Sequence, residues 1–237
     1  MSRMFPFITH TVNPLGGGPC PFNCYHGGCW ANLMKTRYGW EKYKGPWRVI
    51  EKELKNFKHG DMVFPFDMTE IGAPGIPENI ITELMAWIAR QPCEMLLLSK
   101  NPAFYRINAD IMPHNAWLGA TIETDSSITL EHSKAPTPWR RLVEMQWVAE
   151  NLPANKTFVS IEPIMKFSPD FERSIMKIKP HAVAVGYDNY KNGLPEPRLA
   201  ATESLIKELE EFTTVYRKTI REARPLTTTK RTPEDES

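Results

Sequence analysis

One stretch of the chain, Cys20-Pro21-Phe22-Asn23-Cys24-Tyr25-His26-Gly27-Gly28-Cys29-Trp30, contains three of its four cysteines in a C-x3-C-x4-C spacing. Glycines at 16–18 precede it and two more lie inside it. Because glycine adopts positive φ without a steric penalty, we expect the backbone to fold tightly and the three thiols to converge. Convergent thiols in a reducing compartment indicate a metal site. Three protein ligands without an evident fourth predict a metal centre with an open coordination position.

Composition describes an ordinary globular chain. Of its 237 residues, 41% are hydrophobic and 24% charged, and the formal net charge is +1. The length suffices for a single α/β barrel, and the near-zero charge gives no global electrostatic argument for a nucleic acid or membrane partner. No run approaches the roughly 18 apolar residues of a membrane helix, and the first seven residues are too short for a signal peptide. We expect a cytoplasmic protein whose cysteines are ligands or free thiols.

Apolar runs and amphipathic segments alternate along the chain. Six strands are expected, and a short seventh is a candidate at Thr213–Tyr216; the six are Met4–Val12, Asp61–Asp67, Cys93–Leu98, Ala116–Ile122, Thr157–Ile161 and His181–Val185. The expected helices are Trp30–Tyr38, one starting at Pro77, Pro138–Glu150, Asp170–Ile178 and Pro197–Phe212. This alternation predicts βαβ units and a parallel sheet.

Six strands are too few for a closed eight-stranded barrel. The predicted fold class is therefore α/β, a partial (βα)6 TIM-like barrel with parallel strands, and an open doubly wound sheet is the alternative. We expect one domain over residues 1–220. The last residues, 221–237, lack apolar periodicity and are expected to form a disordered tail.

Polar residues collect where the expected strands end, which is where parallel α/β folds carry their working residues. The cysteine loop follows the first strand, and the next five strand ends also carry polar residues. The residues concerned are Asp67, Thr69 and Glu70, then Ser99 and Lys100, Thr121 and Glu123, Ser160 and Glu162, and Tyr187 and Asp188. Their convergence on a metal loop would form one active site.

Several phrases occur in the order found in one superfamily: N-P-L-G-G-G-P-C at 13–20, L-L-L-S-K-N-P at 96–102, W-L-G-A-T-I-E at 117–123, F-V-S-I-E-P at 158–163 and A-V-G-Y-D at 184–188. With the cysteine loop, they resemble the radical S-adenosylmethionine (radical SAM) superfamily, and within it the phage-type relatives of spore photoproduct lyase. The resemblance spans roughly residues 8 to 216. It implies a partial barrel, a [4Fe-4S] cluster, SAM as the molecule at the open iron, and a one-electron donor resembling flavodoxin or ferredoxin.

The resemblance also implies roles for individual residues. Cys20, Cys24 and Cys29 would hold the cluster. Tyr25 would flank the adenine of SAM, while Asp67, Thr69 and Glu70 would lie near its amino group. Lys100, beside Ser99, would reach its carboxylate, and Thr121 and Glu123 would lie near the ribose. Glu162 and Tyr187 would face the substrate as catalytic candidates.

Other interpretations stay open. The superfamily's usual spacing is C-x3-C-x2-C, so His26 is an alternative third ligand to Cys29. Structural zinc in a non-catalytic α/β binding module, with His10 or His26 as a fourth ligand, is the alternative function. Its partner would be a nucleic acid, which the basic residues from Arg217 onward could contact. Lys100 could be a surface residue, and Glu123 and Glu162 could instead form structural ion pairs with Arg140, Arg141 or Lys166.

Overall fold

The computed structural model describes residues 4–18 and 20–226. Seven parallel strands form one sheet in the order β1-β4-β5-β6-β7-β8-β9, and the sheet curls through 201° into a half-barrel. Its strands are β1 (His10–Thr11), β4 (Met62–Phe64), β5 (Glu94–Ser99), β6 (Ala116–Thr121), β7 (Thr157–Ile161), β8 (Ala182–Val185) and β9 (Thr214–Arg217). The predicted partial barrel is confirmed.

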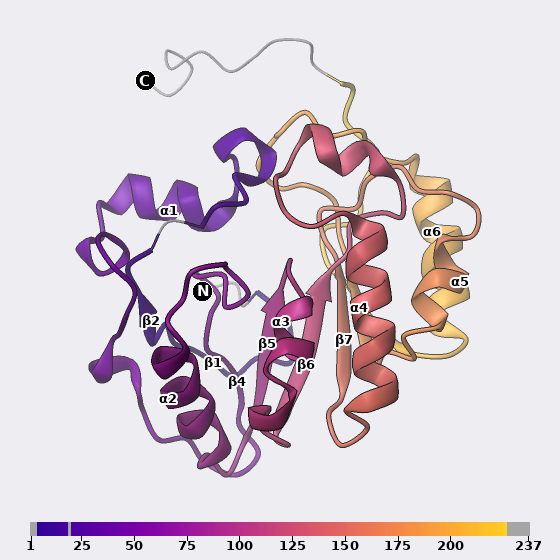
Figure 1. Ribbon diagram of the computed structural model, residues 1–237. Helices are drawn as coiled ribbons and strands as arrows, with labels where there is room; N and C mark the ends of the chain where they lie inside the picture. Colours follow the sequence, from indigo (N-terminus) through magenta and orange to yellow (C-terminus); the bar gives the residue numbers. More distant parts are fainter. Residues whose placement is uncertain (1–3, 19, 227–237) are drawn as a thin grey trace.

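Helices cover the convex face of the sheet, as Figure 1 shows for α2, α4, α5 and α6. The helices are α1 (Trp30–Tyr38), α2 (Glu78–Ala89), α3 (Ala103–Ile107), α4 (Pro138–Asn151), α5 (Phe171–Met176) and α6 (Leu199–Glu210). Every residue of β6, β7 and β8 is buried, as expected for parallel strands covered on both faces. The helices bury their apolar stripes against these strands in one continuous core.

The concave face is filled at one end by the N-terminal segment. Phe5 packs edge-on against Phe158 at a centroid distance of 5.1 Å, and Phe7 stacks on Trp117 at 5.7 Å. The predicted strand over Met4–Val12 is therefore wrong for most of its length: only two residues pair with β4, because the preceding aromatic side chains are buried inside the half-barrel.

Two further elements differ from the sequence expectation. The ladder between β2 (Leu15–Gly16) and β3 (Arg48–Val49) is antiparallel and was not predicted. The short helix α3 was not predicted either. Helix α1 has the predicted bounds, and the seventh strand candidate is present as β9.

The C-terminal segment is partly described. Residues 221–226 contain no helix or strand, yet Arg221 donates to both carboxylate oxygens of Glu196, and Arg224 donates to the carbonyl oxygen of Asp188. The rest of the predicted tail, 227–237, lies outside the described residues. Within the described part of the chain, no helix combines the length and hydropathy needed to cross a bilayer.

Candidate active site

A cavity of about 820 Å³ opens at the carboxyl ends of the strands. Twelve of the thirteen predicted site residues line it, and Glu123 lies buried behind the lining. The cysteine loop, the loop after β4 and residues at the carboxyl ends of β5 to β9 contribute to its walls. The fold therefore gathers strand-end residues from most of the chain around one space.

The cysteine loop has an unusual backbone. Asn23, Tyr25 and His26 adopt positive φ values of 42°, 57° and 53°, in the left-handed region that non-glycine residues seldom occupy. Gly27 follows at 96°. Each such non-glycine residue carries a conformational penalty of about 1–3 kcal/mol, and such residues cluster at functional sites. The loop is thus bent to present its side chains, and surrounding contacts must hold it.

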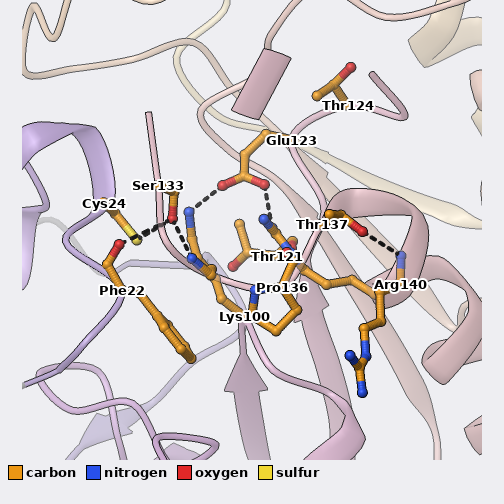
Figure 2. Close-up of polar contacts among 12 residues, drawn as sticks. Phe22, Cys24, Lys100, Thr121, Glu123, Thr124, Ser133, Pro136, Thr137 and Arg140 are labelled. Atoms are coloured by element: carbon orange, nitrogen blue, oxygen red, sulfur yellow. Dashed lines mark hydrogen bonds and ion pairs between the residues drawn. The ribbon is translucent and has the colours of Figure 1, made fainter. Parts of the chain in front are cut away.

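Two other loops supply those contacts. From the loop between β6 and α4, Ser133 Oγ lies 3.3 Å from Cys24 Sγ, and Lys134 N donates to the carbonyl of Phe22 at 2.7 Å; Figure 2 shows the Ser133 contact. From the loop after β8, Asn192 approaches Gly28 so closely that a Cβ there would lie 1.8 Å from Asn192 Oδ1. The second glycine is therefore required for this close approach.

The three thiols line the same cavity and pack around one small apolar cluster. The pKa of Cys20 is raised to about 11, chiefly by burial and in smaller part by negative charge on Glu70, Cys24 and Cys29. Burial also raises the pKa of Cys24, against the influence of Lys100. A cation bound among the thiols would offset both effects and release their protons.

The donor set fits an iron–sulfur cluster in chemical type, because thiolates are the usual ligands of such clusters. Within residues 4–18 and 20–226, no three His, Cys, Asp or Glu side chains are gathered at metal-binding spacing. Between the two candidates for the third ligand, Cys29 lines the cavity, whereas the exposed His26 packs its ring against His132 at 5.8 Å. The choice of Cys29 over His26 as the third ligand, and the expected convergence of the three thiols on a metal, stay predictions.

Behind the loop lies a buried polar network, which we call the Glu123 network: Tyr25, Lys100, Glu123 and Arg141. Arg141 donates to Glu123 Oε2 at 2.5 Å, while the other carboxylate oxygen accepts from Lys100 and, at 2.8 Å, from the Tyr25 hydroxyl. Both Glu123 and Arg141 are 1% exposed. Burial alone would raise the pKa of Glu123, but Arg141 and Lys100 hold it down to about 2.

The network holds the Lys100 ammonium group against Tyr25 and Glu123 at the edge of the cavity. Lys100 Nζ lies 2.6 Å from the Tyr25 hydroxyl and 4.5 Å from the centre of its ring. Figure 2 shows the Lys100 side chain directed at Glu123. Lys100 is thus a buried member of a fixed network and not a surface lysine.

The carboxyl groups of Glu70 and Asp67 accept hydrogen bonds from other groups of the protein. Glu70 accepts from Ser99 Oγ at 2.5 Å and from the backbone N–H groups of Gly72 and Lys100 at 2.9 and 3.0 Å. Asp67 accepts from the side-chain amide of Asn13 at 2.5 Å. Burial raises the pKa of both carboxyl groups. These bonds fix the loop after β4 to the neighbouring strand ends.

Thr69 contrasts with its neighbours. Its hydroxyl is buried, lines the cavity and has no hydrogen-bond partner among the described residues. A buried unpaired hydroxyl is unfavourable by roughly 1–3 kcal/mol, so it requires an explanation. A bound ligand with a polar group at this point would satisfy it.

The remaining wall carries an ion pair that the sequence did not predict. Glu162 Oε2 accepts from Lys218 Nζ at 2.8 Å, so its partner is none of the cations considered from the sequence. We call the wall formed by Glu162 and Lys218 the β7–β9 wall. The Tyr187 hydroxyl is directed into the fold, where it bonds the Pro197 carbonyl and lies 2.7 Å from Thr202 Oγ1, so its catalytic role stays a prediction.

Sequence reasoning missed Ser133 and Lys218 and left Arg141 as one of three candidate partners. Ser133 and Lys218 are polar residues next to charged neighbours, without any motif of their own. Arg141 had one available signal, because its position inside an amphipathic helix places it on the buried side with Leu142 and Met145. An arginine on such a face requires a buried anion.

The fold and site define a class: a parallel α/β half-barrel with a thiol-bearing loop after its first strand and a cavity at the carboxyl ends. No model of a protein family and no curated protein matches the chain. The similar solved structures include SuiB of Streptococcus suis bound to its precursor peptide SuiA, with TM-score 0.54, 11% identity, and coverage of 90% of this chain and 49% of SuiB.

SuiB bound to S-adenosylmethionine gives TM-score 0.52, 11% identity, and coverage of 90% of this chain and 51% of SuiB. A variant of spore photoproduct lyase gives TM-score 0.54, 10% identity, and coverage of 90% and 65% of the two chains. The chain therefore spans about half to two thirds of these proteins. Both neighbours are radical SAM enzymes. At these identities the likeness shows the fold alone.

Proposed function

We propose that this protein is a radical SAM enzyme that binds a [4Fe-4S] cluster through Cys20, Cys24 and Cys29 and cleaves SAM reductively. The observation that carries the proposal is the position of the three thiols: they line a cavity at the carboxyl edge of a half-barrel whose fold neighbours include a protein bound to S-adenosylmethionine. A reduced cluster held by Cys20, Cys24 and Cys29 would supply the electron for cleavage of a C–S bond of SAM, with methionine and a 5′-deoxyadenosyl radical as the two products.

The chain's own residues bind and orient SAM. Lys100 supplies a positive charge for its carboxylate, and the ring of Tyr25 supplies an aromatic surface for its adenine. The unpaired Thr69 hydroxyl offers an acceptor for its amino group, next to the buried carboxyl of Glu70. Thr121 lies at the end of β6, in the lining, for the ribose. Glu123 contributes through Tyr25 and Lys100, which it holds in place.

Structural zinc in a binding module is not favoured. Of the two proposed fourth ligands, His10 lies 3.3 Å from Asp61 at the amino end of the sheet, away from the cysteine loop. His26 packs on His132 outside the cavity lining. An uncompleted thiol set suits a centre that binds an exchangeable molecule.

The test is anaerobic reconstitution of the full chain with iron and sulfide. We expect a brown protein whose visible absorption spectrum shows the charge-transfer bands of an iron–sulfur cluster. After SAM and dithionite are added, we expect 5′-deoxyadenosine to form. Metal analysis should show iron in excess of zinc. A colourless preparation that retains zinc alone and leaves SAM intact would refute the proposal.

A further inference from the structure

The ion pair of the β7–β9 wall is built into the site by the backbone. Gly186 lies between the two side chains, where a Cβ would come 3.0 Å from Lys218 Cβ and 3.3 Å from Glu162 Oε1. The Lys218 amide donates to the Val185 carbonyl at 2.9 Å, and the Gly186 amide donates to the Ile161 carbonyl at 3.1 Å. The glycine therefore leaves room for an acid and a base to meet across the end of β8.

The pair retains unused hydrogen-bonding capacity toward the cavity. Among the described residues, the side chains of Glu162 and Lys218 form one hydrogen bond, and it joins them to each other. An ammonium group has three donors and a carboxylate has several acceptor positions. The side chains are 17% and 16% exposed, and both line the cavity. A ligand can therefore receive a hydrogen bond from Lys218 and donate one to Glu162.

The charges select the kind of ligand. Because the pair is neutral overall, a ligand group with a net charge would meet one matching and one opposing charge at nearly the same place. An uncharged group with a donor and an acceptor side by side satisfies both partners at once. A secondary amide in a trans peptide does not, because its N–H and C=O point in opposite directions.

The rest of the wall suits a flat apolar body. Phe5, Phe64, Phe66 and Leu98 line the same cavity, and Lys218 Nζ lies 4.8 Å from the centre of the Phe5 ring. Apolar walls with a few convergent polar groups are typical of small-molecule sites.

We propose that Glu162 and Lys218 recognise a cis-amide edge of the substrate, meaning an N–H and a C=O adjacent on one side of a planar, uncharged group. A lactam within a ring and a primary carboxamide both have this chemistry. The inference rests on the proposed function only in taking this cavity as the substrate site.

The experiment uses the reconstituted full chain and three probes. Uridine carries a lactam, 3-methyluridine has the same ring with its N–H blocked, and a capped glutamine carries a primary carboxamide. Saturation-transfer NMR and calorimetry report binding, and SAM cleavage is measured on the same preparation. We expect uridine, capped glutamine or both to bind, and 3-methyluridine to bind about tenfold more weakly than uridine if the lactam is the recognised form.

Variants test whether probe binding depends on Glu162 and Lys218. Lys218→Met and Glu162→Gln should each weaken the bound probe about tenfold. The matched control is the Glu94–Lys156 ion pair, 2.6 Å apart and about half exposed, where Glu94→Gln and Lys156→Met should leave binding unchanged. If a single variant fails to fold, the uncharged double variant E162Q/K218M takes its place, with circular dichroism as the check on folding.

The outcomes separate the two proposals. If capped glutamine alone binds, the source is a carboxamide; if uridine alone binds, it is a ring lactam. Equal binding of uridine and 3-methyluridine, without binding of capped glutamine, would overturn the inference. So would the absence of binding by all probes to protein that cleaves SAM. Binding by protein that does not cleave SAM would uphold this site and refute the proposed function.

Discussion

Two carboxylates of the candidate site, Glu123 behind the cavity lining and Glu162 in it, have opposite surroundings. Glu123 is 1% exposed and has both oxygens bonded to cations, whereas Glu162 is 17% exposed and shares one bond with one cation. Arg141 and Lys100 lower the pKa of Glu123, whereas burial raises the pKa of Glu162 in spite of Lys218. A carboxylate whose bonds are complete serves to hold other residues. One with bonds to spare can bind a ligand.

The largest effect is expected at the cysteine loop. Replacing Cys20, Cys24 or Cys29 by alanine should abolish iron retention and SAM cleavage, because each removes one of three thiolates. Iron and sulfide analysis after reconstitution measures this. The matched control is Cys93→Ala, at a buried cysteine outside the cavity lining, which should load iron normally. Equal iron in the two kinds of variant would contradict the assignment.

Removing a partner from the Glu123 network comes next. Arg141→Met leaves a buried carboxylate with part of its compensation, and breaking a buried ion pair in this way reduces stability by about 3–5 kcal/mol. Urea unfolding monitored by circular dichroism gives the free energy of unfolding.

The neighbouring Arg140→Met provides the control on the same helix. Arg140 is exposed, so this change should alter stability by less than about 0.5 kcal/mol. A similar loss in both variants would show that the helix, and not the buried pairing, is responsible.

Acid should remove the contribution of Glu123. Its pKa is lowered from 4.5 to about 2 in the folded protein, so its stabilisation is present above pH 4.5 and is lost as the pH falls toward 2. The size is about 3 kcal/mol from the linkage between pKa and stability. Urea unfolding across this range should show a steeper decline for the wild type than for Glu123→Gln. Parallel curves would exclude this linkage.

Two buried threonine hydroxyls, one without and one with a hydrogen-bond partner, should show the same contrast with a smaller effect on stability. Thr69→Val replaces a buried unpaired hydroxyl, so the ligand-free protein should gain about 1 kcal/mol. Thr124→Val removes a buried hydroxyl that donates to the Lys166 carbonyl at 2.6 Å, and it should lose about 1 kcal/mol. Thermal unfolding of both variants measures the difference. The Thr69 variant should also bind SAM more weakly.

Much of the site followed from sequence because parallel strands end at one edge. Any polar residue directly after an apolar run is placed there by topology, which is why Lys100, Thr121 and Glu162 were found. The ion-pair partners of these residues were harder to predict from the sequence. Glu123 pairs with an arginine 18 residues away and Glu162 with a lysine 56 residues away, and no periodicity connects residues on different elements.

The fold shows the same division. Helix α1 and strand β7 were predicted with their observed bounds, since their patterns fill a whole element. The N-terminal aromatic run read as a strand, because alternation cannot distinguish pairing from packing inside a half-barrel. The β2–β3 ladder has two residues on each strand, too few for any pattern.

The smallest effect returns to Glu162 and has the opposite sign to that of Glu123. Because its folded pKa is raised above 4.5, its contribution to stability is present below pH 4.5 and declines as the pH rises through the folded value. Relative to Glu162→Gln, the wild type should therefore lose stability on going from acid toward neutral pH, where Glu123→Gln reveals a gain. Lys218 opposes the shift, so the change is smaller than for Glu123. Urea unfolding of both variants across one pH series measures it, and slopes of the same sign would mean that the two carboxylates do not differ as the structure indicates.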